Sequence, residues 1–516
     1  MDIGTSGIRG QLLDIAAGKV LRSCILSRNP IPGSNIMDHL TFAIDHGVGR
    51  AKELLLRAVG DIITSLEPEC LQRISVCGNP IQLSLFEGIE IKDLAYAGEN
   101  KLRSENIQRV ERTGRTIRGD VIGLSQNIEV LIPPAVRHEI GADALAMMLR
   151  SGFLDDDMCM VTDYGTNAEM ALKVDDDIYT GSAAAGPALE GQQISCGMLA
   201  GPGALSDLVR TQSGWTMKVL DEKLNAQDGP LLNLRSSIVR KKGTVPTGIT
   251  GTGLIALIHA GIQDDRIEPP RIRGNTIDLG RGLCLSEDDL KEAGKAIGAV
   301  RAGHITLMKE AGVNAKDIST MYMAGAAGTY MDPLKAKSIG MVPAYSKKIV
   351  QAGNTSLELA KDLALRPEMM DYLNTIAEEI SAKHIMFASS PVFSTIYVME
   401  LAYWTEGMPL NMYRTRLSQL GIEFPDKESE TVTERRHSDI ADTGSSLKFS
   451  EPTVTYEAAW DCGKCMRCIS SCPEKALSLS GGSFRMSTGR CLGSACSECE
   501  AKCRERKFRR SVFELP

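Results

Sequence analysis

Eight cysteines near the end of the chain follow two spacings that suit iron–sulfur chemistry. The first spacing is C-x2-C-x2-C-x3-C-P, and its cysteines are Cys462, Cys465, Cys468 and Cys472. The second spacing is C-x4-C-x2-C-x3-C, and its cysteines are Cys491, Cys496, Cys499 and Cys503. A loop with such spacing offers three thiolates to one iron–sulfur cluster, while its fourth thiolate reaches a neighbouring cluster.

The spacing therefore predicts two [4Fe–4S] clusters that exchange one ligand each. We expect one cluster to take Cys462, Cys465, Cys468 and Cys503, and the other to take Cys491, Cys496, Cys499 and Cys472. The alternative is structural zinc, which favours two C-x-x-C pairs separated by about 12 to 20 residues. The other cysteines are scattered without a C-x-x-C pair, as expected for small buried side chains.

Two turns within residues 1–424 each begin with an aspartate and carry small polar residues. The first turn holds Asp2, Gly4, Thr5, Ser6 and Gly7, and the second holds Asp163, Gly165, Thr166 and Asn167. Glycine permits a tight turn, while hydroxyl and backbone N–H groups bind phosphate oxygens. We expect the turns to lie in two half-domains that bind one polyphosphate, with Asp2 and Asp163 holding Mg2+ and orienting an attacking water. The alternative is two ordinary β-turns in which each aspartate makes local hydrogen bonds.

Two further stretches of small residues are expected on the nucleoside side of the same site. One places Gly251, Thr252 and Gly253 before an apolar helical run, and the other places Gly325, Ala326 and Gly328 after a strand. Small residues at such positions let the backbone approach a ribose, a phosphate or a flat base. Between the two stretches the pattern predicts a long helix with Ser286 as its N-cap and acidic residues in its first turn.

This alternation of strand, turn and helix predicts an α/β fold in two lobes, followed by a small domain that carries the eight cysteines. We place the first lobe at 1–153, the second at 154–424, a linker at 425–454 and the cysteine domain at 455–516. The segment that follows residue 424 is polar and charged with almost no periodic apolar face, which is typical of a solvated linker. The alternative is that it forms a surface loop of the main domain.

The composition narrows the classes of partner. A net charge of -7 and a pI of about 5.7 argue against nucleic acid. The first residues do not form a cationic and apolar leader, and the longest apolar window is interrupted by Ser, Pro and Glu. We therefore expect a cytoplasmic protein that does not bind a membrane.

The order of the turns resembles that of the acetate and sugar kinase, Hsp70 and actin superfamily. More closely, residues 77–89, 131–149, 162–172 and 323–343 look like the reductive activators of corrinoid proteins. The tandem cysteine motif resembles the activators that serve methylamine methyltransferases in methylotrophic methanogens. The resemblance implies a two-lobed actin- and Hsp70-like ATPase fold with a small α+β ferredoxin-like domain behind it. It also implies the ATP-dependent reduction of an inactive Co(II) corrinoid protein to the methyl-accepting Co(I) state.

The same resemblance implies cofactors and partners. The cofactors are two [4Fe–4S] clusters and ATP with Mg2+, and the partners are the corrinoid proteins of methylamine methyltransferases and an upstream low-potential electron donor. Members of the family usually have several apolar residues before the first aspartate, whereas only Met1 precedes Asp2, so we expect a truncated or misassigned start. The alternatives are an activator of a radical dehydratase or of a different corrinoid methyltransferase system. A metabolite kinase or an Hsp70-like binding module would have no use for eight clustered cysteines.

Overall fold

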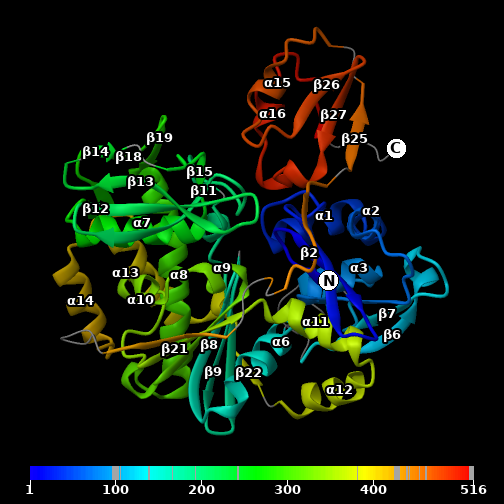
Figure 1. The fold of residues 1–516 in the computed structure, drawn as a ribbon, viewed down its shortest axis with the longest axis horizontal. Helices are drawn as coiled ribbons and strands as arrows, with labels where there is room; N and C mark the ends of the chain where they lie inside the picture. The colour runs from blue at the N-terminus through cyan, green and yellow to red at the C-terminus, as the bar shows by residue number, and fades with distance from the viewer. Residues whose placement is uncertain are drawn as a thin grey trace. The chain divides into compact units, whose positions relative to one another are not determined.

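The structure is a computed structural model that describes residues 1–510 except 96–103, 105, 137–139, 166, 192, 237, 241–242, 381, 424–429, 437–439, 441, 453 and 460–461. The chain divides into two compact units, whose elements are labelled in Figure 1. Unit 1 comprises residues 1–145, 356–379 and 442–516. Unit 2 comprises residues 146–355 and 380–441. Among the described residues no helix is both long and apolar enough to cross a membrane.

Unit 1 is built on a five-stranded sheet with the order β24-β3-β2-β1-β5. The strands are β1 (Asp2–Ile3), β2 (Ile8–Asp14), β3 (Lys19–Leu26), β5 (Cys77–Gly78) and β24 (Leu447–Ser450). Strands β1, β2 and β3 form an antiparallel meander, and β5 and β24 add to its two edges in parallel. Helices α1 (Ile36–His46) and α2 (Val48–Leu66) follow β3. The buried residues of α2 recur every three or four positions from Ala51 to Leu66, so this face packs on β2 and β3.

A second, three-stranded sheet of unit 1 has the order β4-β7-β6, with β4 at Arg73–Ser75, β6 at Arg115–Arg118 and β7 at Glu129–Ile132. Further helices of unit 1 are α3 (Pro80–Glu87), α4 (Lys92–Ala95), α11 (Thr355–Leu365) and α12 (Met369–Glu379), while α6 (Ala142–Ser151) begins in unit 1 and ends in unit 2. The sequence analysis placed α11 and α12 in the second lobe, whereas residues 356–379 lie in unit 1. Asn374 of α12 explains this return, because its amide group exchanges two hydrogen bonds with the backbone of Gly114, at 2.7 and 3.1 Å.

Unit 2 is built on a seven-stranded sheet with the order β22-β10-β9-β8-β20-β21-β23. The strands are β8 (Met158–Tyr164), β9 (Ala168–Val174), β10 (Asp177–Ala183), β20 (Thr320–Ala324), β21 (Lys348–Gly353), β22 (Ala382–His384) and β23 (Val432–Arg435). All five residues of β20 are buried, as expected for a central parallel strand. The long helix α8 (Glu287–Ala311) begins with a capping box on Ser286, which confirms the predicted helix and its N-cap.

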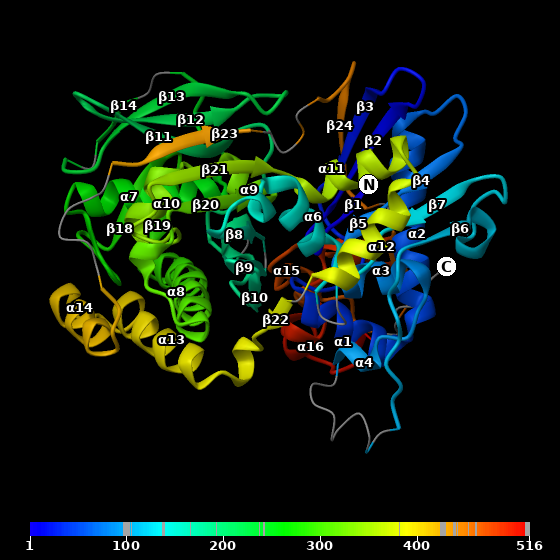
Figure 2. The same ribbon diagram turned by 90° about the horizontal axis from the view of Figure 1, so that it is seen from below.

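Unit 2 also contains a second sheet, two hairpins and further helices. A five-stranded sheet has the order β14-β13-β12-β11-β15, with β11 (Ala204–Thr211), β12 (Gly214–Leu220), β13 (Ala226–Asn233), β14 (Ile238–Arg240) and β15 (Gly248–Ile249). Two hairpins pair β16 (Ile267–Glu268) with β17 (Arg271–Ile272), and β18 (Thr276–Gly280) with β19 (Leu283–Ser286). The other helices are α7 (Gly251–Gln263), α9 (Gly325–Tyr330), α10 (Pro333–Ile339), α13 (Pro391–Trp404) and α14 (Leu410–Gln419). Helices α8 and α13 pack side by side, as Figure 2 shows.

The cysteine region forms a small α+β arrangement within unit 1. Its three-stranded antiparallel sheet has the order β25-β27-β26, with β25 (Thr455–Ala458), β26 (Leu477–Ser480) and β27 (Ser483–Ser487). Two short helices, α15 (Arg467–Ser470) and α16 (Glu498–Ala501), lie beside each other. Each short helix sits inside one of the two cysteine motifs.

The segment predicted as a solvated linker, 425–454, contributes one edge strand to each unit. Part of this segment lies outside the described residues. Strand β23 pairs in parallel with β21 of unit 2, and β24 pairs in parallel with β3 of unit 1. The prediction therefore missed two strands here. The polar composition hid them, although β-branched residues surround Val432 and apolar Leu447 alternates with Phe449.

Candidate functional site

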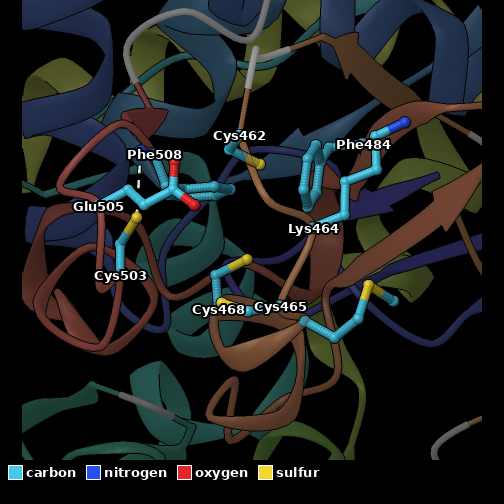
Figure 3. A pocket seen from close by; sticks show the side chains of 9 residues that line it. Cys462, Lys464, Cys465, Cys468, Phe484, Cys503, Glu505 and Phe508 are labelled. Atoms are coloured by element: carbon cyan, nitrogen blue, oxygen red, sulfur yellow. Dashed lines mark hydrogen bonds between the residues drawn. The ribbon is translucent and has the colours of Figure 1, made fainter.

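Four cysteines drawn from both motifs line one pocket of unit 1, which we call the first cysteine pocket. They are Cys462, Cys465, Cys468 and Cys503. Figure 3 shows their side chains around a common space, with Phe484 and Phe508 beside them. The two aromatic rings meet edge to face with their centroids 6.0 Å apart, so the pocket has an apolar wall.

The backbone folds tightly around this first pocket. Lys464 and Met466, which stand on either side of Cys465, have φ angles of 44° and 61°. Left-handed backbone is uncommon outside glycine, and here it turns the loop around the cysteines. The Sγ of Cys503 accepts a hydrogen bond from the Phe508 backbone N–H at 3.4 Å, which Figure 3 marks with a dashed line. Hydrogen bonds to cysteine sulfur are one means by which a protein tunes an iron–sulfur cluster.

The other four cysteines of the two motifs line the second cysteine pocket. They are Cys472, Cys491, Cys496 and Cys499. Arg490 and Arg510 also line this pocket. The Sγ of Cys472 accepts a hydrogen bond from the Ala476 backbone N–H at 3.2 Å. The pocket therefore offers thiols together with positive side chains that can offset the negative charge of a thiolate-bound centre.

The two pockets group the cysteines as the predicted ligand exchange requires. Cys503 of the second motif joins three cysteines of the first, and Cys472 of the first motif joins three cysteines of the second. The neighbouring helices α15 and α16 bring this about, because each motif ends next to the other. Within the part of the chain that the structure describes, no three His, Cys, Asp or Glu side chains converge closely enough to hold a single metal ion. The pocket lining therefore agrees with the predicted grouping, while the binding of clusters by these cysteines stays a prediction.

Burial raises the pKa of several of these thiols. The pKa of Cys499 rises to about 11, and burial also raises the pKa values of Cys468 and Cys491. Cys465, by contrast, is exposed. A thiol must lose its proton before it binds a metal, so metal binding to the buried thiols releases protons and strengthens as the pH rises.

The first aspartate-led turn lies between β1 and β2 of unit 1. The Gly4 N–H donates to the Gly7 carbonyl at 3.1 Å and closes the turn. A Cβ on Gly7 would lie 2.5 Å from the Leu26 carbonyl oxygen, so glycine is required there. The Oγ1 of Thr5 accepts a hydrogen bond from Asn79 Nδ2 at 3.2 Å.

Asp2 precedes this turn on β1 and is nearly buried. Its carboxylate lies 3.8 Å from the Arg9 guanidinium. Burial first, and then the charge of Asp2, raises the pKa of Asp143 to about 6. The sequence analysis missed Asp143, although this residue lies in the 131–149 segment that carries the family resemblance. A pair of carboxylates that interact in this way is typical of sites that bind cations or protons.

The second aspartate-led turn begins at the end of β8 in unit 2. The Gly165 N–H donates to the Asn167 carbonyl at 3.2 Å. Gly325 stands directly beside Asp163, because a Cβ on Gly325 would lie 2.1 Å from the Asp163 Oδ1. The structure thus joins Asp163 to the stretch that holds Gly325, Ala326 and Gly328 at the start of α9. Thr166 lies outside the described residues.

His304 supports the same turn from α8. One of its ring nitrogens, Nε2, lies 2.8 Å from the Thr162 Oγ1, next to Asp163 in β8. Burial lowers the pKa of His304 to about 3, so the ring is neutral at physiological pH. No pattern in the sequence singles out His304, and only the fold brings it to Thr162.

The third stretch, Gly251 to Gly253, begins helix α7 and is buried. The Thr250 hydroxyl caps the helix by accepting from the Gly253 N–H at 3.0 Å. A Cβ on Gly253 would lie 2.1 Å from the Leu205 carbonyl oxygen, and Thr252 Oγ1 donates to the Ser206 carbonyl at 3.0 Å. These contacts give the stretch a packing role against β11. Its part in nucleotide binding stays a prediction.

Comparisons with known proteins agree on one family. A family model described as the RACo middle region matches residues 1–156, and one described as the C-terminal domain of RACo, the ASKHA domain, matches residues 157–414. The chain is 43% identical over 492 residues to the [Co(II) methylated amine-specific corrinoid protein] reductase of Methanosarcina barkeri, covering 93% of this chain and 91% of the relative. It is 24% identical over 443 residues to the corrinoid activation enzyme RamQ of Eubacterium limosum, covering 78% and 69%.

A solved structure described as the reductive activator for corrinoid,iron-sulfur protein has a similar fold. The TM-score is 0.63 at 22% sequence identity, and the match covers 78% of this chain. This chain spans 65% of the length of that structure. The fold class expected from the turns is confirmed in its larger part: it is the α/β ASKHA fold, of the actin and Hsp70 kind. The chain belongs to the RACo family of reductive activators of corrinoid proteins.

Proposed function

We propose that the protein is an ATP-dependent reductase that returns the inactive Co(II) form of a methylamine-specific corrinoid protein to the Co(I) state. The observation that carries this proposal is the 43% identity to the methylated amine-specific corrinoid protein reductase over 93% of the chain. Membership of the RACo family supports the same reaction. The corrinoid protein is thus the substrate, and its cobalt is the atom that is reduced.

The ASKHA fold implies that ATP is bound, and we assign the phosphate side of the site to the two aspartate-led turns. In unit 2, Asp163 would hold Mg2+ or orient the attacking water, and Gly325 leaves the room that its carboxylate needs. In unit 1, the turn that follows Asp2 would supply backbone N–H groups to phosphate oxygens. Neutral His304 would fix the Thr162 side chain without adding charge beside Asp163.

We assign the two cysteine pockets to two [4Fe–4S] clusters in a ferredoxin-like domain. The donor set fits, because each pocket presents four thiols and one backbone N–H bonded to a cysteine sulfur. When bound, such clusters supply electrons one at a time at potentials between about -700 and +450 mV. One thiol of each pocket is buried, Cys468 in the first and Cys499 in the second.

The proposed reduction of cobalt gives a reason for an ATP site and iron–sulfur clusters to occur in one protein. The Co(II)/Co(I) couple is difficult for ordinary donors to reach, and a deficit of roughly 300 mV corresponds to about 7 kcal/mol for one electron. A coupling energy between two sites is typically only about 1 to 3 kcal/mol. The turnover of ATP is a source of the remaining free energy. We infer that closing and opening around nucleotide controls the grip of the protein on its corrinoid partner.

The visible spectrum of a corrinoid protein under anaerobic conditions tests this function. With a chemical reductant and Mg-ATP, the intact chain is expected to convert Co(II) to Co(I) in a methylamine-specific corrinoid protein, and to do so far more slowly without ATP. Asp163→Ala is expected to abolish ATP hydrolysis and Co(I) formation while leaving the iron content near eight per chain, as two [4Fe–4S] clusters require. Asp176→Ala is the matched control, because Asp176 is exposed in the turn between β9 and β10.

Three results would contradict the proposal or one of its parts. Full-rate Co(I) formation without ATP would show that nucleotide does not drive the reduction. Preference for the corrinoid protein of another methyltransferase system, over the methylamine-specific one, would show that the substrate is assigned wrongly. A protein that retains no iron under anaerobic purification would contradict the assignment of the cysteine pockets.

A further inference from the structure

The loop that joins β3 to α1, residues 27–35, lies between two parts of unit 1 with different proposed roles, the first aspartate-led turn and the second cysteine pocket. Its sequence is SRNPIPGSN, and we call it the proline loop. Asn29, Pro30, Ile31 and Pro32 are all buried, which is unusual for a connection that carries no regular structure. The loop bonds both to the first aspartate-led turn and to residues of the second cysteine pocket.

Asn29 makes the contacts with the turn. Its backbone N–H donates to the Ser6 carbonyl at 2.8 Å, and its Nδ2 donates to the Gly4 carbonyl at 2.9 Å. The same Nδ2 lies 3.1 Å from the Gln82 Oε1, inside the protein. Asn29 is only 4% exposed, so these bonds do not compete with water. A movement of the first aspartate-led turn would therefore displace Asn29 as well.

Gly33 and Arg28 make the contacts with the cysteine pocket. The Gly33 N–H donates to the carbonyl of Cys491, one of the four cysteines of the second pocket, at 2.8 Å. The Arg28 guanidinium lies 2.9 Å from the carboxylate of Glu474, which also lines that pocket. The loop thus holds the backbone of a predicted cluster ligand and places a positive charge beside an acidic neighbour of the pocket.

The loop is stiff enough to transmit a displacement over this short distance. Two prolines fix its φ angles at Pro30 and Pro32. The Asn29 Oδ1 accepts a hydrogen bond from the Ile31 N–H at 3.0 Å, which braces the turn between them. At its far end the Ser34 N–H and the Asn35 cap both bond to Asp38 of α1.

We propose that the proline loop couples nucleotide binding at the first turn to the redox state of the cluster held in the second cysteine pocket, with Asn29 as the positioning residue. This inference rests on the proposed function, because it needs both a nucleotide and a cluster. Net charge is one of the factors that set the potential of an iron–sulfur cluster, and Arg28 adds charge beside the second pocket. Gly33 acts on the position of a ligand, because it bonds to the backbone carbonyl of Cys491. The first cysteine pocket is not part of the coupling, because no contact of the loop described above reaches its four cysteines.

Linkage makes the coupling measurable without turnover. If nucleotide shifts the potential of the cluster, reduction of the cluster must change nucleotide affinity by the same factor. A tenfold change in affinity corresponds to about 59 mV for one electron. The quantity to measure is therefore the ratio of the dissociation constants of a non-hydrolysable Mg-ATP analogue for the oxidised and the dithionite-reduced protein, taken anaerobically on the full chain.

In the wild type, the two dissociation constants are expected to differ by about tenfold. This difference corresponds to a shift of about 59 mV in the potential of the cluster when nucleotide binds. The reduced protein is expected to show one electron paramagnetic resonance signal that Cys472→Ser removes, which is the signal of the second cluster. The nucleotide analogue is expected to alter this signal and no other. Asn29→Ala is expected to bring the ratio to one. Asn29→Asp is expected to do the same, because it keeps the acceptor for the Ile31 N–H but loses the donor to Gly4 and Gln82. Arg28→Ala, which is half-buried and leaves Asn29 in place, is expected to reduce the ratio.

The control is Asn374→Ala. Asn374 also bridges two segments of unit 1 through its amide, but it bonds to Gly114 and not to the turn or to a cysteine pocket. This variant is expected to keep the wild-type ratio. Because the readout is a ratio, a general loss of affinity cancels.

In a protein that holds iron and binds nucleotide, three outcomes would overturn the coupling. They are a wild-type ratio of one, an unchanged ratio in Asn29→Ala and Arg28→Ala, or an equal loss of the ratio in Asn374→Ala. Failure of the proposed function looks different, because a wild-type protein without iron or without nucleotide binding yields no ratio to compare. Either of those two results removes the basis of the coupling and so overturns it as well.

Discussion

Gly325→Ala should strongly lower the rate of ATP hydrolysis, while it should lower the free energy of unfolding only moderately. Gly325 has a φ angle of 77°, a left-handed conformation that costs roughly 1 to 2 kcal/mol for a residue with a Cβ. The new Cβ would also lie 2.1 Å from the Asp163 Oδ1 and 2.9 Å from the Asp163 Cγ. Ordinary carbon contacts begin at about 3.5 Å, so the carboxylate must move by more than about 1 Å. A misplacement of about 1 Å at a catalytic group can lower the rate about a hundredfold.

Gly312→Ala provides the matched control for that variant. Gly312 ends α8 with a φ angle of 70°, and a Cβ there meets nothing within 4 Å. Both variants therefore carry the same kind of backbone cost, and only Gly325→Ala displaces Asp163. The assay compares the rate of ATP hydrolysis with the free energy of unfolding for the two variants and the wild type. Equal rates of hydrolysis for Gly325→Ala and Gly312→Ala would refute the assignment of Asp163 to the nucleotide site.

The remaining predictions concern the cysteines and a buried histidine. Cys503→Ser should damage the cluster of the first pocket and Cys472→Ser that of the second, and unchanged iron content and paramagnetic signals in both variants would contradict the exchanged ligation. His304, whose pKa falls to about 3 by burial, binds a proton more readily in the unfolded chain, so its contribution to stability is complete above pH 6.5 and is lost as the pH falls toward 3. Relative to His304→Gln, the free energy of unfolding of the wild type should drop by about 2 kcal/mol between pH 7 and pH 5, measured by denaturant titration. A constant difference between the two proteins would show that His304 is not buried in its neutral form.

Patterns local in sequence were sufficient to predict much of this molecule. The N-cap at Ser286 is confirmed, and it could be predicted because its partner Asp289 lies only three residues away. The spacing of the cysteines predicted two groups that each mix both motifs, and the same groups line the two pockets because α15 and α16 lie beside each other. The binding of clusters by these groups stays a prediction. The family was predicted from residues 77–89, 131–149, 162–172 and 323–343 together with the tandem cysteine motif, and the comparisons confirm it.

Features that depend on distant residues could not be predicted in this way. Asn29 is an ordinary loop asparagine until the fold brings it to Gly4 and Gln82. Gly253 resembled a nucleotide contact in sequence, and only the packing of α7 on β11 reveals the Leu205 carbonyl that excludes a side chain. Strands β23 and β24 carry polar residues because they lie at sheet edges, so their composition resembles that of a linker.

Strand β24 changes how the cysteine region must be understood within unit 1. Its last residue, Ser450, pairs with Leu26 at the end of β3, and both the N–H and the Oγ of Ser27 donate to the Ser450 carbonyl, at 2.9 and 3.2 Å. From this point one segment enters the proline loop and the other continues toward the cysteines. The two segments meet again where Gly33 bonds to Cys491. A flexible tether would let the cysteine pockets move freely, whereas a region fixed at two such points must move together with the loop and with the turn that Asn29 holds.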